Sequence, residues 1–110
     1  MSLDTSQLTT DMSNAIKGVL SDKWPKIKEY GETESKKLAE SFAMIEKLKL
    51  KNEIDDEEAR LQFKIQKNAS RTVLLTIEGL GVLAAEEAIN AAMKVVKDTV
   101  NSALGFTLIK

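Results

Sequence analysis

The sequence predicts an all-α protein, folded as a bundle of three or four helices that includes helical hairpins. One proline and five glycines in 110 residues leave long stretches without a helix breaker. Alanine, leucine, lysine and glutamate, which favour helices, are frequent. Apolar residues also recur at helical spacing along most of the chain. Because 110 residues is a usual size for one domain, residues 1–110 are expected to form a single helical domain.

The first helix is predicted over residues 5–21. Thr5 or Ser6 is expected to cap it, because a short side-chain oxygen accepts a hydrogen bond from the free amides of the first turn. The apolar residues of this helix recur at intervals of three and four residues, as an amphipathic helix requires. They are Leu8, Met12, Ala15, Ile16, Val19 and Leu20.

A second helix is predicted over residues 24–51. Pro25 is expected in its first turn, where the missing amide hydrogen of proline costs no hydrogen bond. Asn52 follows the last apolar residue and is expected to close the helix. The apolar stripe of the helix consists of Ile27, Tyr30, Leu38, Phe42, Ile45 and Leu48.

A third helix is predicted over residues 55–78. Asp55 and Glu58 have the spacing of a capping box, in which each side chain accepts from the other residue's backbone amide. The short connection predicts an antiparallel hairpin with the second helix. A polar stripe expected to face solvent contains Arg60, Lys64, Lys67 and Arg71. The opposite side, expected to be buried, contains Leu61, Ile65, Ala69, Val73, Ile77 and Leu80.

The segment after Gly79 and Gly81 is apolar and rich in alanine, and a helix is predicted over residues 82–104. Its polar residues centre about 140° away from the polar stripe of the third helix, so the exposed side changes across the glycines. Two readings follow. Either the glycines form a turn and a fourth helix folds back, or one long C-terminal helix passes through and serves in self-association. The apolar tail 105–110 is expected to pack on the bundle or on a neighbouring subunit.

Composition excludes several chemistries. Without cysteine the chain forms no disulfide and no thiolate metal site, and without histidine it lacks the commonest general base and zinc ligand. The net charge of −1 is not the basic excess typical of nucleic-acid binders. Charges interrupt the longest apolar stretch, which argues against a membrane-spanning helix. We expect no enzymatic activity, no metal or cofactor, no small-molecule substrate and a cytoplasmic location.

These observations predict a non-enzymatic structural or protein–protein interaction module. Its contact surface is expected to be the broad apolar face of the last helix, with a helical partner protein or a second copy of the chain as partner. One alternative is a peripheral protein that lays the same face on a membrane surface. Another is a nucleic-acid accessory protein that uses the Arg60–Arg71 basic stripe. The candidate interaction residues, which serve as interface or as core, are Leu80, Ile89, Ala92, Val96 and Phe106.

Overall fold

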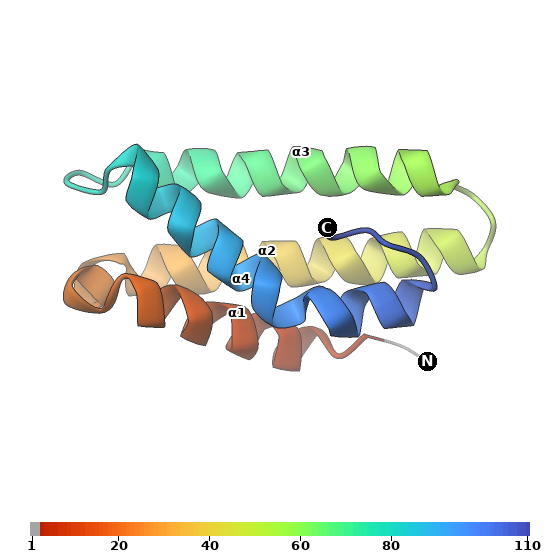
Figure 1. Cartoon of the computed structure of the whole chain (residues 1–110), viewed down its shortest axis with the longest axis horizontal. Helices are drawn as coiled ribbons and strands as arrows, with labels where there is room; N and C mark the ends of the chain where they lie inside the picture. The colour runs from red at the N-terminus through yellow and green to blue at the C-terminus, as the bar shows by residue number, and fades with distance from the viewer. Residues whose placement is uncertain (1–2) are drawn as a thin grey trace.

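A computed structural model of the chain describes residues 3–110 and contains, over that range, four α-helices (Figure 1). Successive helices run in opposite directions and form an elongated bundle of 43 × 22 × 20 Å. Helix α1 packs against α2 and α4, and α2 packs against α3, whereas α3 and α4 contact each other over a shorter stretch. The predicted all-α bundle of helical hairpins is confirmed. The elements are α1 (Thr5–Val19), the 3₁₀ helix η1 (Ser21–Lys23), α2 (Trp24–Leu50), α3 (Asp56–Leu75) and α4 (Val82–Leu104).

Helix α1 is capped by Asp4, so the predicted cap at Thr5 or Ser6 is wrong. The backbone of Asp4 is extended, and its Oδ1 accepts a hydrogen bond of 3.1 Å from the amide of Gln7. Three adjacent residues are able to cap a helix here, and Asp is a better cap than Thr. The helix ends at Val19, two residues before the predicted end at residue 21, because the chain tightens into η1.

The end of α2 confirms the predicted role of Asn52. Asn52 has a φ of +56°, in the left-handed region that asparagine tolerates better than most residues. Its amide donates to the carbonyl of Lys49 at 3.0 Å, and the amide of Glu53 donates to the carbonyl of Leu48 at 2.9 Å. These two bonds form a Schellman motif, which satisfies carbonyl groups that the helix end leaves free.

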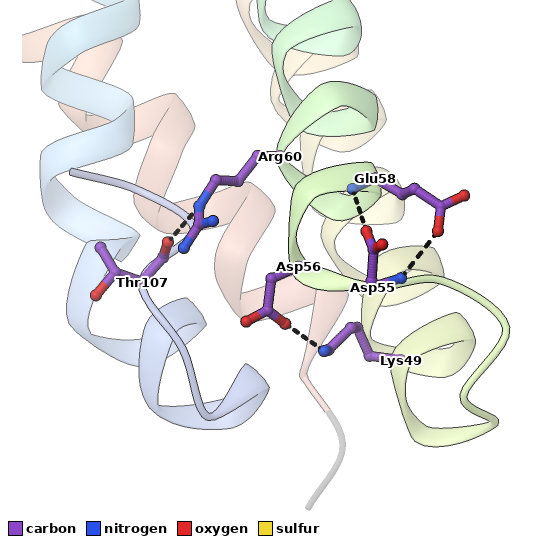
Figure 2. Close-up of polar contacts among 6 residues, drawn as sticks. All are labelled: Lys49, Asp55, Asp56, Glu58, Arg60 and Thr107. Atoms are coloured by element: carbon purple, nitrogen blue, oxygen red, sulfur yellow. Dashed lines mark hydrogen bonds and ion pairs between the residues drawn. The ribbon is translucent and has the colours of Figure 1, made fainter.

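The start of α3 shows the predicted capping box (Figure 2). Oδ1 of Asp55 accepts from the amide of Glu58 at 2.8 Å, and Oε1 of Glu58 accepts from the amide of Asp55 at 3.1 Å. Next to it, Lys49 of α2 forms an ion pair with Asp56 of α3. The α2–α3 hairpin is therefore closed by hydrogen bonds on both sides of its short loop.

The buried side of α3 differs from the predicted one. Leu61 and Ile65, predicted to be buried, are 59% and 62% exposed. The ring of Phe63 lies 5.5 Å from the ring of Phe42 in α2, and this large contact sets the rotation of α3 about its axis. Ala69 is also exposed, while Ile77 and Leu80 are buried in the loop after the helix. The core-facing residues of α3 are Ala59, Phe63, Ser70 and Leu74.

The glycines between the last two helices form a turn. Helix α3 ends at Leu75, Gly79 takes a φ of +85°, and α4 begins at Val82. A left-handed backbone of this kind suits glycine, which has no Cβ to clash. The ammonium groups of Lys23 and Lys26 donate to carbonyls of this loop and tie it to the start of α2. The reading with a single long C-terminal helix is therefore wrong.

Gly31 in α2 gives a prediction about stability. A Cβ at position 31 would lie 2.8 Å from Cζ3 of Trp24, a buried ring that fills the space beside the glycine. We expect Gly31→Ala to lower the free energy of unfolding by about 1–3 kcal/mol, as overpacking does. The matched control Gly18→Ala in α1 meets no atom within 4 Å and is expected to raise it by about 0.5–1 kcal/mol. Urea unfolding followed by circular dichroism measures both, and equal changes would contradict the packing argument.

Candidate functional site

The predicted interaction residues of the last helix lie in the core of the single chain. Ile89, Ala92 and Val96 of α4 are buried, and so is Leu80 in the preceding loop. With neighbouring alanines they pack α4 closely against α1. A partner reaches these four residues only if the bundle opens. Phe106 differs, because it is half-buried in the C-terminal segment.

A surface that a partner reaches directly lies between α3 and α4. The two helices start close together at the α3–α4 turn and diverge toward the other end of the molecule (Figure 1). The C-terminal segment 105–110 folds back into the wider end. The remaining space is a groove of about 620 Å³, which we call the α3–α4 groove. Its lining comprises Arg60, Phe63, Lys64, Lys67, Asn68, Asn90, Met93, Lys94, Lys97 and Leu108–Lys110.

The walls of the α3–α4 groove are strongly basic. Half of its lining residues are lysine or arginine, and none of the described residues that line it is an aspartate or a glutamate. The chain as a whole has a net charge of −1, so the fold gathers cations at this place. Like charges on the walls of a concave surface reinforce one another and attract anions. The six cationic residues are Arg60, Lys64, Lys67, Lys94, Lys97 and Lys110.

Three residues of the predicted basic stripe thus belong to this groove. Arg60, Lys64 and Lys67 come from α3, and Lys94 and Lys97 face them from α4. Sequence reasoning places the two lysines of α4 on the polar side of that helix and misses them as site residues. Their spacing of three residues, which sets them on one line of a helix, is the only local signal.

Arg71, the fourth residue of the stripe, lies where α3 and α4 are close. Its Nη1 forms an ion pair of 2.7 Å with Oε1 of Glu86, and both side chains are nearly half exposed. An exposed pair of this kind contributes at most about 1 kcal/mol, so it orients the two helices more than it stabilises them. The Nε of Arg71 is buried and has no acceptor among the described residues.

The floor of the groove is apolar. Phe63 and Met93 contribute the helical part, and Leu108 and Ile109 contribute the part made by the tail. All four side chains are largely buried, so only their outer edges are available to a ligand. The ammonium group of Lys67 lies 5.5 Å from the centre of the Phe63 ring, within the range of a cation–π contact. The groove therefore offers cations above an apolar strip.

The tail is held by two side chains that sequence reasoning did not single out for this role. Asn101 Oδ1 accepts from the amides of Leu108 and Ile109 at 2.9 and 3.0 Å, and its Nδ2 donates to the carbonyl of Ile109 at 2.8 Å. Arg60 Nε donates to the carbonyl of Thr107 at 3.1 Å (Figure 2). The predicted packing of the tail on the bundle is confirmed, and its contacts fix the wide end of the groove.

The chemistry that this arrangement supports is recognition of an anion with an apolar side. Over residues 3–110, no three His, Cys, Asp or Glu side chains gather as a metal site would require. No helix in the same range has the length and apolar character needed to cross a lipid bilayer.

No protein-family model, curated protein or solved structure matches this chain, so the groove is interpreted from its own geometry.

Proposed function

We propose that the protein is a non-enzymatic helical interaction module whose α3–α4 groove binds an acidic amphipathic helix of a partner protein. The observation that carries the proposal is the lining of the groove, with six cations, no carboxylate side chain in its described part, and an apolar floor. An acidic amphipathic helix is complementary to both features. Its apolar face meets Phe63 and Met93, and its acidic flanks meet the lysines of the two walls.

A helix suits this groove because the groove already lies between two helices. Amphipathic helices dock by laying an apolar stripe into an apolar groove, with anchors spaced three and four residues apart. Here α3 and α4 diverge (Figure 1), and the α3–α4 groove lies between them. Opposite charges on the two partners speed the encounter and fix the register of docking.

The same observations rank the alternatives lower. A membrane binder is expected to use the apolar face of residues 82–104, but most of that face is buried in the core, and its exposed large apolar residues are Val82, Leu83 and Val95. The apolar floor of the α3–α4 groove is recessed between basic walls, which suits a narrow helix better than a flat bilayer. For a nucleic acid, the phosphates would meet the cations while the apolar floor stayed unmatched. Among the described residues that line the groove, Phe63 is the one aromatic residue, and the small edge that it exposes is too little for a base to stack on.

Charge reversal on one wall tests the proposal. The double variant Lys94→Glu/Lys97→Glu is expected to weaken binding at least about tenfold, which is about 1.4 kcal/mol. The probe is a fluorescent helical peptide of about 18 residues, about 27 Å long, with leucines at helical spacing and glutamates elsewhere. Fluorescence anisotropy gives the dissociation constant. A peptide with lysines in place of the glutamates is expected not to bind.

The matched control changes the same number of charges outside the groove. Lys28 and Lys47 are exposed on α2, so Lys28→Glu/Lys47→Glu alters the net charge equally without touching the walls. We expect this variant to bind the peptide within about twofold of the unmodified protein, because neither lysine lines the groove and salt screens exposed charges. Equal weakening by both variants, or no binding of the glutamate peptide, would contradict the proposal. Preferential binding to phosphatidylserine vesicles or to a DNA duplex would instead support one of the alternatives.

A further inference from the structure

We infer that the segment Phe106–Lys110 is a built-in competitor for the α3–α4 groove, and that the partner helix binds fully only after displacing it. The inference rests on the proposed function and adds its regulation. Leu108, Ile109 and Lys110 form part of the lining of the groove at its wide end, and the side chains of Leu108 and Ile109 are buried in the core. A helix that extends along the whole groove therefore meets the tail at the wide end.

Displacing the tail leaves the backbone hydrogen bonds of the four helices intact and exposes Leu108 and Ile109, which belong to the buried core. Helix α4 ends at Leu104 with its own C-cap, in which Gly105 has a φ of +75° and donates its amide to the carbonyl of Asn101. The helix is therefore complete without the tail, and glycine at this position gives the chain freedom to swing. Beyond Gly105, the hydrogen bonds that hold the tail join the side chains of Asn101 and Arg60 to backbone atoms of the tail, with Asn101 accepting two of them and donating one. Such bonds do not depend on the side chains of the tail.

The tail also contacts Arg60, one of the cations of the groove. The Phe106 ring centre lies 5.3 Å from Cζ of Arg60 and 5.0 Å from Nζ of Lys49. Arg60 additionally donates to Thr107, so the guanidinium group is engaged on the tail (Figure 2). Displacing the tail frees Arg60 for a carboxylate of the partner, while Lys110 leaves the groove with the tail.

A tethered competitor acts at a high effective concentration, about millimolar for a short linker, and so raises the apparent dissociation constant of the partner. Loosening the tail should therefore tighten binding. Asn101→Ala removes the three hydrogen bonds to Leu108 and Ile109 and is expected to lower the dissociation constant of the glutamate peptide at least about fivefold. Asn14→Ala, at an exposed asparagine of α1, is the matched control and is expected to leave it unchanged.

Amide hydrogen exchange in the unmodified full chain provides the second readout. The amides of Leu108 and Ile109 are bonded to Asn101, and we expect saturation with the glutamate peptide to accelerate their exchange at least about tenfold. Suppose that the peptide binds, and that Lys94→Glu/Lys97→Glu weakens its binding, while the two amides stay protected. That outcome would show that the tail is a fixed wall of the groove, and it would contradict only this inference. An unchanged or weaker affinity of Asn101→Ala would lead to the same conclusion. If the peptide does not bind at all, both the inference and the proposed function fall.

Discussion

Ala92→Glu is expected to unfold the chain rather than to separate subunits. Ala92 has 0% exposure and belongs to the core of the bundle, in which α1 is the main neighbour of α4. A glutamate at this position must either bury a charge without a partner or push the two helices apart. We expect a loss of more than about 4 kcal/mol, which is a large part of the 5–15 kcal/mol that stabilises a typical domain. Far-UV circular dichroism and urea unfolding measure this loss.

The control for this prediction is Val95→Glu. Val95 lies three residues further along α4 and is 49% exposed, so a glutamate there remains in water. Its effect is expected to stay within about 0.5 kcal/mol, as is usual for surface substitutions. Light scattering on both variants separates the two roles that the sequence allows for Ala92. If the Ala92→Glu protein were folded and its mass in solution were smaller than that of the unmodified protein, Ala92 would be an interface residue.

Local signals in the sequence predicted some of the helix ends. Helix α4 has the predicted bounds of 82 and 104 because Gly81 and Gly105 flank an uninterrupted helical pattern. The capping contacts at Asn52, and those between Asp55 and Glu58, join residues only a few positions apart in the sequence. Their roles therefore follow from local residue type and spacing. The end of α3 was placed at residue 78 instead of Leu75, since the pattern runs on past the point where the turn begins.

The rotation of α3 did not follow from its own sequence. The helix has apolar residues on two sides, and the more continuous row, with Leu61 and Ile65, is the exposed one. Phe63 decides the outcome through a contact with Phe42, a residue 21 positions away. Because this contact depends on the register of the hairpin, a single-helix pattern did not reveal it. The basic stripe consequently borders α4 instead of facing away from the bundle.

The candidate groove was predictable only in part. The stripe of Arg60, Lys64 and Lys67 is visible as helical spacing, and the structure places all three on one wall. The opposite wall depends on the angle between α3 and α4, and the wide end depends on the hydrogen bonds between Asn101 and the tail. Both are tertiary features that no local pattern encodes. Charge was therefore predicted, but its concave arrangement above an apolar floor was not.

The second large effect is expected for Phe42→Ala. Phe42 is fully buried in α2, and its ring lies 5.5 Å from the ring of Phe63 with a tilt of 35°. Truncation leaves a cavity in the middle of the α2–α3 contact, and we expect a loss of about 3–5 kcal/mol. Tyr30→Ala is the matched control, since Tyr30 is an aromatic residue of the same helix and is 47% exposed. Its effect is expected to be below about 1 kcal/mol. Urea unfolding compares the two variants.

Phe63, which contacts Phe42, connects the core with the groove. It packs on Phe42 and also forms part of the groove floor, so the pair sets the rotation of α3 at which its cations face α4. In a double-mutant cycle with Phe63→Ala, we expect a coupling energy of about 0.5–1.5 kcal/mol. If Phe42→Ala remains folded, its affinity for the glutamate peptide is expected to fall although position 42 does not line the groove. Additive losses in the cycle, together with unchanged affinity, would show that the orientation of α3 does not depend on this pair.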